Sequence, residues 1–341
     1  MTPADTGAET RAATEAWFLA HGLPYFVPEE QAAARSALRP RRLLPLLLLT
    51  VVLAGAGGFA VAWLAGQASA APAVLVTAGL LAGAAYAVTA LRARPILSWA
   101  ATRTVSSLRH ALRMASRALP LLLLFVTFLF INAEAWELAG TMAPGVLWLV
   151  VVLLAALAVV FLVVRLPEEV DRADDAVDDA FLLRACAGTP LEETCRRLVA
   201  DRGVDPAAYA VVTGPARLNL VLALVVIQAA QVLLLVLSVL VFFLVFGSLT
   251  MTDAVQLGWT GQEEGDLGNL PYLTNVSVEL FQVSLFLAAF SGLYFTVSAL
   301  TDDAYRSQFL SDVTRHLEQA VGTRAVYLAA FGTQPGERPA P

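Results

Sequence analysis

The sequence predicts an all-α integral membrane protein: a polytopic bundle of six transmembrane helices in three hairpins, with amphipathic cytoplasmic helices and both termini cytoplasmic. Six apolar runs each reach about the ~20 residues that a helix needs to cross ~30 Å of hydrocarbon. Of the 341 residues, 58% are hydrophobic and only 15% are charged. That leaves too little polar surface to cover a soluble fold of this size.

The positive charges give the orientation. All 22 basic residues are arginine: five precede the first apolar run, six lie between the second and third, seven between the fourth and fifth, and four follow the sixth. The other three connections contain none. Because cytoplasmic loops are enriched in arginine close to the spans, we expect an N-in, C-in topology in a bacterial cytoplasmic membrane. The arginines flanking the runs, such as Arg42, Arg117 and Arg217, carry this inference.

The predicted spans, in order, are Leu43 to Ala65, Ala71 to Leu91, Leu119 to Leu138, Gly145 to Val164, Leu218 to Leu249 and Val276 to Leu300. The first has no cleavable signal before it and should act as an uncleaved anchor. The chain divides accordingly into a cytoplasmic N-terminal segment (1–42), hairpin 1 (43–91), a basic cytoplasmic helix (92–118), hairpin 2 (119–164), an acidic helical loop (165–217), hairpin 3 (218–300) with an acidic outer loop (250–275), and a C-terminal helix with a disordered tail (301–341).

The N-terminal segment combines a predicted helix, Thr6 to Ala20, with a stretch that two prolines, Pro24 and Pro28, keep out of a helix. Its aromatic residues should dock on the membrane interface or on the cytoplasmic bundle. In hairpin 1, glycines recur in both spans, at Gly55, Gly57, Gly58, Gly79 and Gly83. Small residues let helices approach closely, so we expect them to pack the hairpin; a dimer interface is the alternative.

The fifth run is 32 residues long, about 48 Å as a helix, so it must tilt strongly or protrude from the membrane. Gln228 and Gln231 lie near its middle. Amides are unfavourable against lipid, so both should point into the bundle, as hydrogen-bonding contacts between helices or as the polar lining of a solute path.

Two charged stripes mark the cytoplasmic helices. Arginines recur every fourth residue before span three, and acids recur at three or four residues after span four. The stripes are complementary, so the two helices could pair; separately solvated faces are the alternative, and anionic lipid competes for the arginines. The residues concerned are Arg109, Arg113 and Arg117 on one side, and Glu168, Asp171, Asp175 and Asp178 on the other.

Further helices are indicated beyond these stripes. Thr189 can cap a helix that has Pro190 in its first position and Glu192 in a capping box, and that runs to about Asp201. After Asp302, apolar residues recur every fourth position in the C-terminal helix, at Phe309, Val313, Leu317 and Val321.

No catalytic constellation is evident. His21, His110 and His316 fall in three separate segments, and no phosphate loop or nucleophile motif occurs. Cys186 and Cys195 should be reduced thiols, with neither a disulfide nor a zinc site. We therefore expect no enzyme activity, no cofactor and no metal centre.

Acids gather toward the outer side instead. Asn132, Glu134 and Glu137 end span three, and Glu279 and Gln282 begin span six at a similar depth. Acids within the membrane are candidates for function, so a cation site is one interpretation; simple solvation at the interface is the other.

The exclusive use of arginine, with the motif Trp17-Phe-Leu-Ala-His-Gly-Leu-Pro-Tyr-Phe before span one, resembles multi-pass membrane proteins of high-GC actinobacteria. The resemblance implies a bacterial membrane and no particular activity. We expect a membrane scaffold or regulatory protein with the lipid bilayer, a second copy or a cytoplasmic protein as partner, and no nucleic acid. The alternative is a cation channel or secondary transporter that uses the outer acids.

Overall fold

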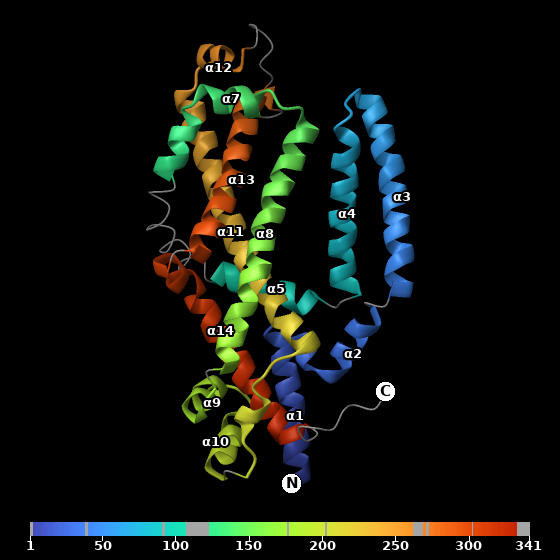
Figure 1. The fold of residues 1–341 in the computed structure, drawn as a ribbon, viewed down its shortest axis with the longest axis vertical. Helices are drawn as coiled ribbons and strands as arrows, with labels where there is room; N and C mark the ends of the chain where they lie inside the picture. Colours follow the sequence, from blue (N-terminus) through green and yellow to red (C-terminus); the bar gives the residue numbers. More distant parts are fainter. Residues whose placement is uncertain are drawn as a thin grey trace.

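The computed structural model describes residues 3–37, 40–90, 93–106, 123–175, 177–201, 203–261, 269–270, 273–301 and 303–332. These residues are almost entirely helical, as predicted (Figure 1). The labelled helices are α1 (Pro3–Ala20), α2 (Pro28–Ala37), α3 (Pro40–Ala65), α4 (Ala70–Thr89), α5 (Arg94–Ser106), α7 (Ala133–Gly140), α8 (Pro144–Asp175), α9 (Asp179–Cys186), α10 (Glu192–Asp201), α11 (Gly214–Thr250), α12 (Asp253–Thr260), α13 (Val278–Thr301) and α14 (Asp303–Phe331), with 3-10 turns η1 (Pro24–Phe26) and η2 (Pro206–Tyr209).

Five helices, α3, α4, α8, α11 and α13, are long and apolar enough to cross a membrane, within the part of the chain that the structure describes. A helix over Leu123–Phe130 and α7 form a sixth candidate if they are counted together. The described arginine-bearing segments lie at one end of the bundle, and α7 and α12 lie at the other (Figure 1). We call these the Arg-side end and the Arg-free end. The fold is therefore that of a multi-pass membrane protein.

The third span differs from the prediction. The helix that begins it stops at Phe130, and α7 leaves it at an angle of 75°, instead of one helix continuing to Leu138. Asn132 causes the break because its side chain caps α7, accepting a hydrogen bond from the Glu134 N–H at 2.8 Å. The buried Trp136 closes the bend by donating its indole N–H to the Phe130 carbonyl at 2.7 Å. As a result, α7 lies across the Arg-free end (Figure 1).

The bundle core is formed where α8, α11 and α13 pack together. Near the Arg-free end, Phe130, Phe243 and Leu280 are almost completely buried. Toward the middle of the same three helices lies a cavity of about 280 Å³. It is lined mainly by small and branched apolar side chains; the hydroxyl of its one polar lining residue, Thr296, donates to the Gly292 carbonyl.

Helix α11 contains 37 residues, about 55 Å at ~1.5 Å per residue. Its first turns are buried among the helices of the Arg-side end, and the predicted tilt or protrusion from the membrane stays a prediction. The excess length thus joins the membrane bundle to the rest of the protein.

The α3–α4 hairpin stands beside this bundle (Figure 1). Only Gly58 packs as predicted, since a Cβ there would lie 2.8 Å from the Ala71 carbonyl oxygen of α4. Gly55, Gly57, Gly79 and Gly83 have no other described atom within 4 Å of a built Cβ. The hairpin contacts α8 near the Arg-free end, where the Trp148 indole N–H donates to the Thr77 hydroxyl at 2.8 Å.

The connection between α11 and α13 is more structured than a loop. Asp253 begins α12, and two short antiparallel strands follow, β1 (Asn269–Leu270) and β2 (Leu273–Ser277). The other acids predicted in this connection, at positions 263, 264 and 266, lie outside the described residues.

Candidate functional site

A folded domain at the Arg-side end is the first candidate site. It comprises α1, η1, α5, α9, α10, η2 and the C-terminal half of α14, packed on the ends of α8 and α11, and we call it the Arg-side domain. One continuous apolar core joins these elements. The predicted N-terminal helix and the predicted docking of the segment after it on the bundle are both present here.

Asn219, in the second turn of α11, holds the N-terminal segment in place. Its side chain is fully buried; its oxygen accepts from the Tyr25 N–H at 2.7 Å, and its NH₂ group donates to the Gly22 carbonyl at 2.9 Å. Gly22 has φ +72°, and a Cβ there would approach the Trp99 ring to 3.0 Å. Glycine is therefore required at this turn both by the backbone conformation and by the close contact.

Aromatic residues extend the contact from α1 to α14. The fully buried Phe18 ring meets Phe26 and Tyr327 edge-on, with centroids 5.3 and 5.5 Å away. Arg324 lies over the Phe26 ring at 5.7 Å and donates to the carbonyl of Val211 at 3.3 Å. Residues more than 300 positions apart in the sequence thus share one core.

The Tyr327 hydroxyl donates to the Glu15 carboxylate at 2.6 Å, and Arg11 donates to the same oxygen at 2.9 Å. Burial alone would raise the pKa of Glu15, but these two hydrogen bonds outweigh it and lower that pKa from its ordinary 4.5. Burial, followed by the bond to Glu15, raises the pKa of Tyr327 to about 12. The pair therefore stabilises the domain when Glu15 is ionised and Tyr327 is neutral.

The signs of these shifts predict two losses of stability. Glu15 contributes fully above its unfolded pKa and loses its contribution as pH falls through its lowered folded value; Tyr327 contributes below 10.0 and loses its contribution as pH rises toward about 12. We expect Tyr327→Phe to lower stability by about 1 kcal/mol at pH 7 and to remove much of the alkaline loss. Thermal unfolding between pH 3 and 11 measures this; an unchanged alkaline limb in the variant contradicts it.

Two tryptophan–histidine pairs meet in the same domain. Trp17 stacks on His21 with ring centroids 3.9 Å apart, and Trp99 lies 5.2 Å from His316. Both pairs line a cavity of about 20 Å³ between α1, α5, α11 and α14, large enough for one water molecule. The sequence does not reveal this group of tryptophans and histidines, because its members come from three distant segments. The third histidine, His110, lies outside the described residues.

Cys186 and Cys195 are both completely buried in the core of the Arg-side domain and are free thiols. The Cys186 thiol donates to Cys195, and this bond and burial raise the pKa of Cys186. Because the thiolate is the reactive form, Cys186 is a packing residue rather than a nucleophile.

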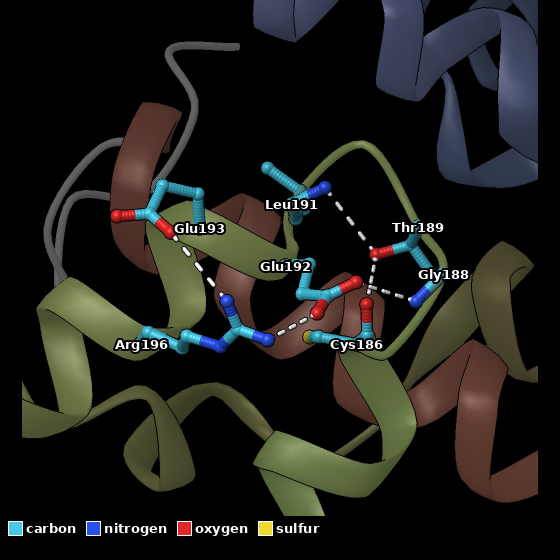
Figure 2. Close-up of polar contacts among 7 residues, drawn as sticks. All are labelled: Cys186, Gly188, Thr189, Leu191, Glu192, Glu193 and Arg196. Atoms are coloured by element: carbon cyan, nitrogen blue, oxygen red, sulfur yellow. Dashed lines mark hydrogen bonds and ion pairs between the residues drawn. The ribbon is translucent and has the colours of Figure 1, made fainter.

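Polar contacts hold the turn between α9 and α10, which follows Cys186 (Figure 2). The Thr189 hydroxyl donates to the Cys186 carbonyl at 2.7 Å, and the Glu192 carboxylate accepts from the Gly188 N–H at 2.8 Å while pairing with Arg196. Thr189 and Glu192 thus lie at the helix start as predicted, although α10 begins at Glu192, two residues later than expected. Its end at Asp201 agrees with the prediction.

The acidic stripe is divided. Asp171 on α8 pairs with Arg217 at the start of α11, at 2.8 Å, while Asp178 caps α9 by accepting from the Phe181 N–H at 2.6 Å. Asp175 ends α8. The predicted partners on the basic helix, Arg109, Arg113 and Arg117, lie outside the described residues, so the pairing of the two stripes remains a prediction.

The second candidate site is a polar cluster at the Arg-free end. Glu279 and Gln282, on the first turns of α13, are buried, and the Gln282 amide donates to the Met142 carbonyl at 3.1 Å. The other polar residues predicted at this depth are exposed on or beside α7: Asn132, Glu134 and Glu137. The structure therefore separates these residues into a buried pair and an exposed group.

Gln228 and Gln231 belong to neither group. Gln228 is fully buried and Gln231 is half-buried, both on α11. Gly247 of the same helix faces Leu280, the residue after Glu279. Since 19 residues separate Gln228 from Gly247, the glutamine lies about 28 Å further along α11 than the level of Glu279.

Buried polar side chains of α12 complete the cluster. Gln256 donates to the Met251 carbonyl at 3.1 Å and accepts from the Ser277 hydroxyl, while the Thr260 hydroxyl donates to the Gln256 carbonyl at 2.8 Å. The sequence predicts a loop at α12, so the burial of these residues is not evident from it.

Comparison with known proteins gives no further assignment: no family model, no curated protein and no solved structure matches this chain.

Proposed function

We propose that this chain is a non-enzymatic scaffold or regulatory protein of the bacterial cytoplasmic membrane, with both termini and the Arg-side domain in the cytoplasm. The observation that carries the proposal is the continuous core of this domain, which joins α1, α5, α9, α10 and α14 to the ends of α8 and α11. A partner that binds the domain is thereby coupled directly to helices that enter the membrane. The arginine distribution supports the orientation.

Exposed apolar and charged side chains on this domain give it the character of a binding surface. Leu183 and Val204 are exposed by 40 and 42%, and Val211 by 65%. On α10, Arg196 and Arg197 are exposed as well. Exposed apolar side chains and arginines both occur at protein–protein interfaces, which favours a cytoplasmic protein as partner.

The alternative, a cation channel or transporter, receives less support from the geometry. A path through the bundle needs the outer acids to converge on polar groups that continue inward. Glu134 and Glu137 are instead exposed, Glu279 is about 28 Å from the level of Gln228, and the cavity between these levels is mainly apolar.

Ion flux in proteoliposomes distinguishes the two functions. We expect the intact protein to give flux of H⁺, Na⁺ and K⁺ no higher than that of empty vesicles, across pH. The matched control is the Glu134→Gln, Glu279→Gln double variant. Flux in the intact protein that disappears in this variant would establish a cation pathway through the outer acids and reject the scaffold function.

Photo-crosslinking in living cells tests directly whether a protein partner binds the Arg-side domain. Ala200 on α10 and Ala254 on α12 are both exposed alanines, one at each end of the molecule. The proposal predicts a defined protein adduct from position 200 and none from position 254. Equal labelling at both positions, or none at position 200, counts against the Arg-side domain as the binding surface.

A further inference from the structure

A buried carboxylate without a counter-charge lies at the Arg-free end. Glu279 is only 5% exposed, the only carboxylate among the buried polar residues that the structure describes. Its Oε2 atom is buried and has no hydrogen-bond partner among the described residues. Taking an ionised carboxylate out of water costs several kcal/mol unless another charge or hydrogen bonds compensate for it.

The described elements that pack around Glu279 carry no positive side chain. Glu279 is surrounded by α7, α12 and the outer ends of α11 and α13, which belong to the stretches 118–164 and 218–305. The sequence of these two stretches contains no arginine, lysine or histidine. No residue of either stretch can therefore form an ion pair with the carboxylate.

Backbone dipoles offset one another around Glu279. The carboxylate lies in the first turn of α13, where the positive end of the helix dipole favours it. However, α7 ends against it: a Cβ on Gly140, the last residue of α7, would lie 3.6 Å from the Glu279 Cβ. Because the C-terminal end of a helix is negative, α7 opposes the contribution of α13.

Residues that carry oxygen atoms pack next to Glu279. The Cβ built on Gly140 would also lie 3.1 Å from the methyl group of Thr260. The Met142 carbonyl accepts a hydrogen bond from the Gln282 amide at 3.1 Å. The Thr260 hydroxyl and the Met142 carbonyl each keep a free lone pair, and Gln282 has an amide oxygen. Carboxylate, hydroxyl, carbonyl and amide oxygens are the ligands of hard cations.

We propose that Glu279, Gln282, Thr260 and the Met142 carbonyl form a binding site for a small monovalent cation of the Na⁺ class, which holds α7 against α12 and α13. The charge of the site favours a monovalent ion, because one carboxylate balances one positive charge. Divalent sites usually gather more acids, and no group of three or more His, Cys, Asp or Glu residues occurs in the described part of the chain. This site is independent of the scaffold function.

Thermal unfolding of the purified full-length protein tests the site, with NaCl exchanged for choline chloride at constant ionic strength. We expect Na⁺ to raise the Tm by roughly 2–4 °C in a saturable manner. Glu279→Gln should remove this dependence. Because the variant lacks the uncompensated charge, its Tm in choline should be as high as that of the wild type saturated with Na⁺. Glu134→Gln, an exposed acid on α7, is the matched control and should keep the dependence.

A second variant covers the case in which Glu279→Gln does not fold. Thr260→Val keeps the shape of the side chain and removes one oxygen, so the Na⁺ concentration for half of the Tm rise should increase roughly tenfold. A Tm that follows ionic strength alone, equal in Na⁺ and choline, overturns the proposal. So does a Na⁺ dependence that is unchanged in the variants.

Discussion

Replacing Asn219 with leucine should release the N-terminal segment from the Arg-side domain. The buried side chain makes two hydrogen bonds, to the Tyr25 N–H and to the Gly22 carbonyl. Leucine makes neither hydrogen bond, and the loss of both at a buried site costs on the order of 3 kcal/mol. Local opening of the segment should become about 100-fold more frequent.

Limited proteolysis measures this opening. Arg11 and Arg35 are trypsin sites on either side of the Gly22–Tyr25 turn, and their cleavage rate should rise by about the same factor when reclosing is faster than cutting. Gln231→Leu is the matched control, since it makes the same type of substitution on α11 at a half-buried position away from the turn. Equal protection of the wild type and Asn219→Leu would show that the aromatic contacts alone hold the segment.

Much of the fold follows from the sequence for a simple reason: spans are set by the length of apolar runs and by the placement of arginine. The unusual length of α11 is an example. Its apolar run exceeds the membrane thickness, and the excess turns are buried in the Arg-side domain. The apolar positions Leu317 and Val321 of the C-terminal helix are likewise buried as their spacing predicted.

The bend in the third span could not be predicted with the same rules. Hydropathy averages over about 19 residues and does not register a single capping residue. Asn132 ends the helix by a local hydrogen bond, and Trp136 stabilises the bend through the Phe130 carbonyl. This bend exposes Glu134 and places the end of α7 against Glu279.

The candidate sites were the least predictable part because they depend on contacts between distant segments. Nothing in the local sequence of Asn219 connects it with Gly22, and nothing around His316 connects it with the cavity that His21 also lines. Glu279 was identified as a candidate from its depth in the membrane. Its neighbours Thr260 and Met142 emerge only from the packing of α12 and α7.

Gly247→Leu should destabilise the membrane bundle strongly. Gly247 faces Leu280 of α13, and a Cβ there would also lie 3.0 Å from the Phe130 ring. Phe130, Phe243 and Leu280 are almost fully buried and leave no room for a larger residue. Overpacking costs about 1–3 kcal/mol or more, so the Tm should fall by roughly 5 °C or more.

Two further variants separate overpacking from a general effect of leucine on a span. Gly79→Leu places the same side chain where no other described atom lies within 4 Å of a built Cβ, and should not lower the Tm, because leucine favours helix more than glycine. Leu280→Ala removes the side chain that the new leucine meets, so the double variant should be less destabilised than the sum of the single effects. Strict additivity would mean that α11 and α13 move apart at this level without a cost specific to their contact, and that Gly247 is not what sets their separation.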